Sequence, residues 1–199
     1  MGPMKALIVI DVQNDFCPGG ALAVADGDAI VSGINALMAD FDAVILTQDW
    51  HPAGHSSFAT THKAEPMSLT EMPYGPQVLW PDHCIQGSVG AAFHKDLNED
   101  AADLIIRKGH NPAIDSYSAF FENDRTTSTG LDGYLRSRGI TDLTMVGLAT
   151  DFCVNYSAVD AAKLGFNVTV RTDLARAIDF DGSLDAALAG MKNAGANIL

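Results

Sequence analysis

Basic residues are scarce in this 199-residue chain. Lysine and arginine together number 12 against 25 aspartates and glutamates, which gives a formal net charge of -13 at pH 7. Binding to nucleic acid or to an anionic membrane surface requires clustered positive charge, so this balance argues against both kinds of partner. The acidity otherwise bears on solubility rather than on fold.

Cysteines and long apolar runs are also few. The three cysteines Cys17, Cys84 and Cys153 are an odd number and do not indicate a disulfide framework. No apolar run approaches the roughly 20 residues of a membrane span, and the N-terminus lacks the basic and apolar stretches of a secretory signal. We therefore expect a cytoplasmic protein with no membrane partner.

Phosphate-binding signatures are missing as well. Neither the glycine-rich dinucleotide fingerprint nor the Walker phosphate loop occurs in the sequence. A nucleotide is therefore not expected as donor or acceptor, and we expect no organic cofactor.

The apolar residues that are present form short runs separated by helical patterns. We expect strands at 5–12, 43–48, 103–107, 142–147 and 167–171, with 196–199 as a short sixth. Continuous Leu, Ile and Val runs are typical of strands buried on both faces of a parallel sheet. Helical spacing predicts helices over about 30–41, 126–138, 154–164 and 184–191. This alternation predicts an open α/β sandwich.

Metal-ligating side chains follow the second expected strand. Asp49 and His51 point to the same side if the backbone is extended. The best third ligand is His83, because Trp80 and Pro81 would hold it stiffly. Two imidazoles and one carboxylate would leave open positions on one divalent ion, for which zinc, iron and manganese are all candidates. The alternative is that Asp49 caps a turn and His51 is an ordinary surface histidine.

The segment that carries these ligands breaks the alternation of strands and helices. Residues 51 to about 98 contain five prolines and several glycines, with weak periodicity. A loop-rich segment of this length inside a compact chain is usually functional or disordered, and its histidines favour function. The chain length suits one domain over residues 1–199, with a loop-rich, metal-binding segment at about 49–98.

Three reactive side chains follow three of the expected strands. Because parallel strands deliver their carboxyl ends to one edge of a sheet, Asp11, Lys108 and Cys153 can lie close together. We expect Cys153 in the first turn of a helix capped by Thr150 or Asp151, where the macrodipole and Lys108 favour the thiolate. Asp11 could accept the thiol proton and pass it to a leaving amine. The alternative is a buried structural cysteine, a solvated lysine and a loop-capping aspartate.

These residues lie in motifs that resemble the nicotinamidase/pyrazinamidase branch of the isochorismatase-like cysteine hydrolases. The matching segments are IDVQNDFCPGG at 10–20, QDWHP at 48–52, WPDHC at 80–84, RKG at 107–109, DSYSAFF at 115–121 and VGLATDFCV at 146–154. The resemblance covers nearly the whole chain. Its two metal segments distinguish nicotinamidases from most of the wider superfamily.

The resemblance implies a three-layer α/β/α sandwich with a six-stranded parallel sheet, and it implies site residues. By role these are Asp11, Lys108 and Cys153 for catalysis, Asp49, His51 and His83 for the metal, Phe16, Trp80 and Tyr117 for the ring pocket, and Ala149 with Cys153 for the oxyanion. His55 would either support the ligands or be an extra ligand. A cis peptide bond between Leu148 and Ala149 is also implied.

The implied reaction is hydrolysis of nicotinamide to nicotinate and ammonia through a cysteine thioester. Pyrazinamide has the same ring nitrogen and amide, so the expected partners are these two small molecules, and a homo-oligomer is left open. Three alternatives remain: another amide or carbamoyl hydrolase of the same superfamily, a non-haem metal oxygenase with two histidines and one carboxylate, and a ligand-binding protein without turnover.

Overall fold

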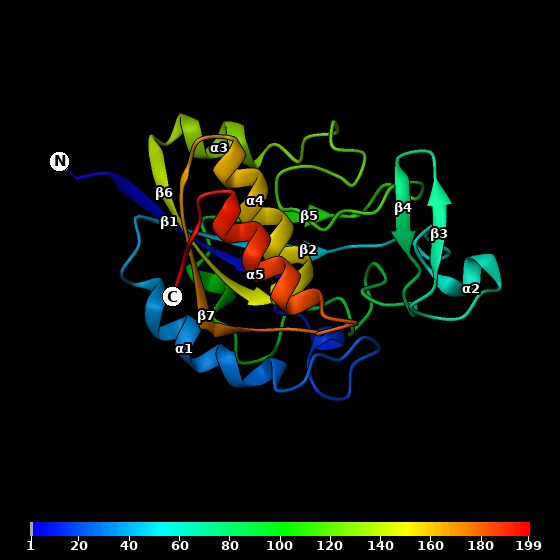
Figure 1. Ribbon diagram of the computed structural model, residues 1–199. Helices are drawn as coiled ribbons and strands as arrows, with labels where there is room; N and C mark the ends of the chain where they lie inside the picture. Colours follow the sequence, from blue (N-terminus) through cyan, green and yellow to red (C-terminus); the bar gives the residue numbers. More distant parts are fainter. Residues whose placement is uncertain (1) are drawn as a thin grey trace.

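The computed structural model of the protein describes residues 2–199 and contains a six-stranded parallel sheet (Figure 1). Its strands are β1 (Met4–Ile10), β2 (Ala43–Asp49), β5 (Leu104–Lys108), β6 (Ile140–Leu148), β7 (Asn167–Arg176) and β8 (Asn197–Ile198). They lie in the order β5-β2-β1-β6-β7-β8, and every neighbouring pair is parallel. The predicted six-stranded parallel sheet is confirmed.

Helices cover both faces of this sheet. The α-helices are α1 (Val31–Met38), α2 (Ala59–His62), α3 (Leu131–Ser137), α4 (Asn155–Lys163) and α5 (Ser183–Asn193), with short 3-10 helices at Asn14–Phe16, Gly27–Ile30 and Glu99–Ala101. Successive side chains of a strand point to opposite faces. In β1, Ile8 therefore packs in the cluster that contains α3, α4 and α5 residues, whereas Leu7 and Val9 pack with α1. The three-layer sandwich is confirmed.

The strand order determines where the sheet opens into a crevice. The chain runs from β1 to β2 and β5 on one side, then returns to β6, β7 and β8 on the other. Connections therefore diverge between β1 and β6, which opens a crevice at the carboxyl ends of these strands. Asp11 follows β1 there, and Cys153 follows β6.

Three elements differ from the sequence-based prediction. The helix expected over 126–138 begins only at Leu131, because the backbone N–H groups of Thr126 and Thr127 donate to Asp124 and form a turn. Residues 150–154 form a π-helix ahead of α4. The loop-rich segment contains α2 and an antiparallel hairpin of β3 (Leu69–Met72) and β4 (Gly75–Val78).

The hairpin and α2 lie together beyond the carboxyl end of β2 (Figure 1). The hairpin has weak alternation, with Pro73 in the turn and Pro76 in β4, which conceals short strands from a periodicity argument. Among the helices that the structure describes in residues 2–199, none has the length and apolar character needed to cross a membrane.

Candidate active site

Asp11, Lys108 and Cys153 meet at the carboxyl edge of the sheet. Asp11 directly follows β1, Lys108 is the last residue of β5, and Cys153 lies in the π-helix after β6. The Lys108 Nζ atom is 2.7 Å from Asp11 Oδ2 and 3.5 Å from Cys153 Sγ. All three side chains are buried, with relative exposures of 0%, 1% and 7% in chain order. The strand order thus brings together three groups that are far apart in the sequence.

One ammonium contacts two carboxylates in this buried cluster. Besides Asp11, Lys108 contacts Asp49 Oδ1, and it donates to the Ser116 carbonyl oxygen at 2.9 Å. Burial lowers the pKa of Lys108, but the two carboxylates outweigh it and hold that pKa well above its usual value. Burial likewise raises the pKa of Asp49, but Lys108 and the neighbouring histidines bring it well below its usual range. Both groups are therefore charged.

Asp11 and Cys153 are both shifted toward their protonated forms. Burial, with Asp49 adding to it and Lys108 opposing it, raises the pKa of Asp11 to about 6. Burial also raises the pKa of the Cys153 thiol well above its usual value, and Asp11 and Asp49 add to that shift against Lys108. Lys108 favours the thiolate, as expected, but burial and the two carboxylates outweigh it. At neutral pH the site holds a thiol beside an ionised Asp11.

Asp49, His51 and His83 form a group that can hold a metal ion. One ligand atom from each lies within 4.8 Å of the others, and Asp49 Oδ2 is 3.6 Å from His51 Nε2 and 3.8 Å from His83 Nε2. The Nδ1–H of His51 donates to the Gly109 carbonyl at 2.8 Å, and that of His83 donates to the Pro81 carbonyl at 2.7 Å. Both Nε2 atoms therefore lie on the Asp49 side of the rings. Metal-bound imidazoles commonly have this arrangement, in which one ring nitrogen donates to a carbonyl and the other binds the ion.

The buried Nε2 atom of His51 supports this interpretation independently. It is fully enclosed and has no hydrogen-bond partner among the described residues. A buried imidazole nitrogen without a partner is costly, and a divalent cation would satisfy its lone pair. The alternative in which Asp49 caps a turn and His51 is a surface histidine is wrong, because both side chains are buried.

His55 lies beside the metal group but does not offer a free nitrogen. Its Nε2–H donates to the Asn111 carbonyl at 2.8 Å, and its Nδ1 accepts from the Ser57 backbone N–H at 3.1 Å. Burial lowers the pKa of His55, with the nearby His51 adding to the shift. Its ring packs 4.5 Å from that of His51, which favours the supporting role over that of an extra ligand.

An aromatic cavity is lined both by Cys153 and by Asp49 and His83 of the metal group. Its lining residues are Phe16, Leu22, Asp49, Trp80, His83, Asp115, Tyr117, Ala149, Phe152, Cys153 and Ile178. The Tyr117 hydroxyl accepts from Trp80 Nε1 at 3.1 Å and from Gln77 Nε2 at 2.9 Å. Phe152 meets the rings of Trp80 and Tyr117 edge to face. The four residues expected at a ring pocket and oxyanion site, Phe16, Trp80, Tyr117 and Ala149, all line this cavity, and the Leu148–Ala149 bond is cis as expected.

Asp151 does not cap the helix of the nucleophile. That helix begins after Ala149 without a side-chain capping bond. The Asp151 carboxylate instead accepts from the backbone N–H groups of Ile178 at 3.0 Å and Asp179 at 2.8 Å, and from the Ser183 hydroxyl. It therefore fixes the loop that places Ile178 on the cavity. The sequence holds no signal for this tie, because the partners lie 27 to 32 residues further along the chain.

Two further polar residues were not predicted. Thr47 donates its hydroxyl to Asp11 Oδ1 at 2.7 Å and accepts the Asp11 backbone N–H at 3.2 Å, which fixes the carboxylate. Asp115 lies on the cavity with Oδ1 3.9 Å from His51 Nε2. Thr47 is two residues before Asp49 on β2, so alternation along the strand could have found it. Asp115 lies in a loop without such a signal.

Comparisons with known proteins place this chain in a family. The isochorismatase domain model matches residues 5–199. A nicotinamidase from Acinetobacter baylyi is 56% identical over 183 residues, which cover 92% of this chain and 86% of that protein. The chain belongs to the isochorismatase family. Another member, the nicotinamidase of Escherichia coli, is 46% identical over 201 residues, 98% of this chain and 94% of that protein.

Solved structures of isochorismatase-family proteins have the same fold. A nicotinamidase/pyrazinamidase of Acinetobacter baumanii is 53% identical, with a TM-score of 0.98 over 100% of this chain and 97% of that chain. The yeast nicotinamidase bound to the inhibitor nicotinaldehyde is 31% identical, with a TM-score of 0.92 over 98% and 99%. The pyrazinamidase of Pyrococcus horikoshii in complex with zinc is 35% identical, with a TM-score of 0.79 over 99% of each chain.

Proposed function

We propose that this protein hydrolyses nicotinamide to nicotinate and ammonia, and that it accepts pyrazinamide. The observation that carries the proposal is the contact of Lys108 with both Asp11 and Cys153 at the end of an aromatic cavity. Relatives at 56% and 46% identity that are named nicotinamidases support the choice of substrate.

The reaction begins with transfer of the Cys153 proton to Asp11. An ionised Asp11 is available at neutral pH because the pKa of its carboxyl is about 6. Sγ then forms a bond to the amide carbon as the carbonyl π-bond electrons move to oxygen. The backbone N–H groups of Ala149 and Cys153 stabilise the resulting oxyanion. Lys108 remains an ammonium throughout and offsets the charge on the sulfur and the carboxylate.

The second half of the reaction returns the proton and releases both products. Protonated Asp11 donates to the amide nitrogen, the C–N bond breaks, and ammonia leaves a thioester on Cys153. A water molecule gives a proton to Asp11 and attacks the thioester carbon. The C–S bond breaks, Asp11 returns its proton to the sulfur, and nicotinic acid leaves and loses its carboxyl proton to water to become nicotinate. One water is consumed for each amide, and the enzyme is regenerated.

The aromatic cavity orients the substrate for this attack. The pyridine ring lies between Phe16 and Trp80, with the amide carbon at Cys153 and the ring nitrogen toward the metal group. Asp49, His51 and His83 would hold one divalent ion, which when bound supplies a Lewis acid for the ring nitrogen. We favour zinc because a relative was solved with zinc, although two imidazoles and a carboxylate also suit iron and manganese.

An ammonia-release assay on metal-loaded protein tests this proposal. We expect turnover of nicotinamide and pyrazinamide and much slower turnover of benzamide, which has the same amide but lacks the ring nitrogen. Equal rates on benzamide or on carbamoyl compounds would favour another amide hydrolase of the family. Product formation that requires dioxygen would favour the oxygenase alternative.

The Cys153→Ala variant tests the nucleophile directly. Loss of an essential nucleophile costs on the order of 10⁴- to 10⁶-fold in kcat, while the substituted alanine leaves the fold and the metal group in place. Ammonia release, metal content and circular dichroism are measured on the same sample. Appreciable turnover by this variant with metal bound contradicts the assignment.

A further inference from the structure

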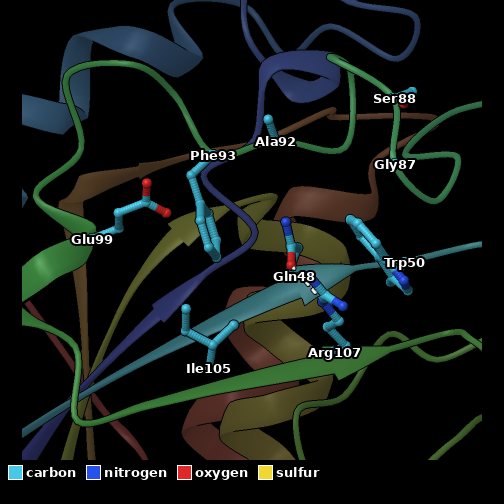
Figure 2. A pocket seen from close by; sticks show the side chains of 9 residues that line it. All are labelled: Gln48, Trp50, Gly87, Ser88, Ala92, Phe93, Glu99, Ile105 and Arg107. Atoms are coloured by element: carbon cyan, nitrogen blue, oxygen red, sulfur yellow. Dashed lines mark hydrogen bonds between the residues drawn. The ribbon is translucent and has the colours of Figure 1, made fainter.

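A second cavity lies behind the active site, on the other side of β2 and β5. It has a volume of about 650 Å³, within the range of small-molecule sites. Gln48 and Arg107 line it, whereas the next residues, Asp49 and Lys108, belong to the active site. Successive strand side chains point to opposite faces, so the two sites lie back to back. Figure 2 shows this second cavity with its lining side chains.

Arg107 is held rigidly at this cavity and has no carboxylate partner. Its guanidinium stacks 3.8 Å from the centre of the Trp50 ring, and its Nε donates to Gln48 Oε1 at 3.1 Å. Among the ion pairs of residues 2–199 none involves Arg107, whereas Arg125, Arg136, Arg138 and Arg171 each contact an aspartate. Arg176 is also without an ion pair, but its Nη1 donates to the backbone carbonyls of Asp173 and Ala175. An exposed guanidinium that is held in place and has free Nη donors can bind an external anion, even in a chain as acidic as this one.

The rest of the cavity favours an aromatic body on that anion. Phe93 and the partly exposed Ile105 lie across the opening from Trp50 and Arg107 (Figure 2). Ring edges and faces pack well against such aromatic and branched apolar surfaces. The Gln48 amide is not free for a ligand, because its Oε1 accepts from Arg107 and its Nε2 donates to the Ala91 carbonyl.

Glu99 limits the charge that the ligand can carry. Its carboxylate also lines the cavity, on the side away from Arg107 (Figure 2). A single guanidinium together with this carboxylate disfavours a phosphate dianion or a second carboxylate. We propose that this cavity binds an aromatic monocarboxylate, with the carboxylate on Arg107 and the ring against Phe93. The proposal does not depend on the amidase activity of the neighbouring site.

The two tryptophans of the chain allow both sites to be observed in one experiment. Trp50 lines this cavity, and Trp80 lines the active site. The protein is labelled with 5-fluorotryptophan, and its two ¹⁹F resonances are assigned with Trp50→Phe and Trp80→Phe. On titration with benzoate we expect a saturable shift of the Trp50 resonance. Its dissociation constant should differ from that of any shift of the Trp80 resonance. Inorganic phosphate, terephthalate and neutral benzamide are expected not to shift the Trp50 resonance.

Arg107→Gln provides the decisive variant. We expect its affinity for benzoate, read at Trp50, to fall at least ~10-fold, because a charge-assisted bidentate contact is lost. Arg136→Gln is the matched control, since Arg136 also stacks on an aromatic ring but pairs with Asp132 outside the cavity. Its benzoate affinity should be unchanged.

Several results would overturn the proposal. They are a Trp50 resonance that does not respond to benzoate, one that moves only in step with Trp80, and an unchanged affinity in Arg107→Gln. Equal binding of benzamide, phosphate or terephthalate would also overturn it, since the guanidinium and Glu99 would then not select the ligand. Because Arg107 is on the surface, the variant is expected to fold, and circular dichroism verifies this.

Discussion

The Lys108 side chain contacts two carboxylates and one thiol inside the buried site. Its ammonium keeps Asp49 ionised, yet it leaves the pKa of Asp11 above the ordinary value, because burial of that carboxyl is the larger effect. The pKa values of two neighbouring carboxyl groups are thus shifted in opposite directions although both contact the same cation. Asp49 remains a permanent anion suited to a metal, and Asp11 becomes a base that can gain and lose a proton near neutral pH.

The raised pKa of Asp11 predicts the acidic limb of the pH profile. Below about pH 6 this carboxyl is protonated in the free enzyme and cannot accept the Cys153 proton. We expect kcat/KM for nicotinamide to fall about tenfold per pH unit below that value and to level off above it. Asp11→Asn should have very low activity without this inflection. A profile flat down to pH 4.5 in the unmodified protein would contradict the role of Asp11.

Gly109 is predicted to control the orientation of a metal-binding histidine. Its φ angle is +67°, and a Cβ atom at this position would overlap the His51 ring. Gly109→Ala should therefore turn His51 away and lower metal affinity by about 10- to 100-fold, measured by competition with a metal indicator. In contrast, Gly133→Ala in α3 meets nothing within 4 Å and should leave metal affinity unchanged. Equal affinities in both variants would contradict this role of Gly109.

At the scale of elements, the π-helix and the loop before α5 act together. Asp151 lies in the same short helix as Cys153, and its carboxylate holds the backbone of Ile178 and Asp179. One wall of the cavity is thus fixed to the element that carries the nucleophile. This tie links the position of Ile178 to that of Cys153, which lines the same cavity.

Asp151→Asn should loosen this wall. The amide replaces one acceptor oxygen with a donor that faces a backbone N–H, so we expect a loss of about 2 kcal/mol in the free energy of unfolding. KM for nicotinamide should rise several-fold more than kcat falls, because Asp151 acts through the cavity wall. Ser183→Ala removes the hydroxyl that donates to Asp151 and accepts the Phe180 backbone N–H, but it leaves both backbone bonds of the Asp151 carboxylate, so we expect a smaller effect on both quantities. Denaturant titration and steady-state kinetics measure them, and an unchanged KM in Asp151→Asn would contradict the positioning role.

At the scale of the whole molecule, the site joins parts of the chain that are far apart in the sequence. Asp11 follows β1, Asp49 ends β2, His83 comes from the loop-rich segment, and Cys153 follows β6. A ligand bound by several of these segments in the folded state alone stabilises the whole fold by mass action.

Metal removal is therefore expected to lower the melting temperature. At a free metal concentration 100 times the dissociation constant, the folded state gains about 2.7 kcal/mol, which corresponds to roughly 5–10 °C for a chain of this size. Thermal unfolding with chelator and after addition of zinc measures the difference. The His51→Ala variant should show almost no shift. A melting temperature that does not respond to metal in the unmodified protein would argue against the proposed site.

Much of the fold could be predicted from local patterns. The buried runs at 5–12 and 43–48 predicted parallel strands, since strands covered on both faces are apolar throughout. The turn at Asp124 and the hairpin at 69–78 could not be predicted, because side-chain hydrogen bonds and short strands leave no periodicity. The motifs placed the candidate site residues, whereas Thr47 and Asp151 became visible only through their contacts.

The sequence by itself determined which reactive groups the protein has and that parallel strands end beside three of them. Apolar runs and residue spacing encode these properties locally. Only the tertiary structure decided that burial raises the pKa of Cys153, that Asp151 ties the cavity wall, and that Arg107 lines a second cavity without forming an ion pair. These outcomes depend on burial and on Coulomb interactions between residues distant in the chain, and both arise only when the elements pack together.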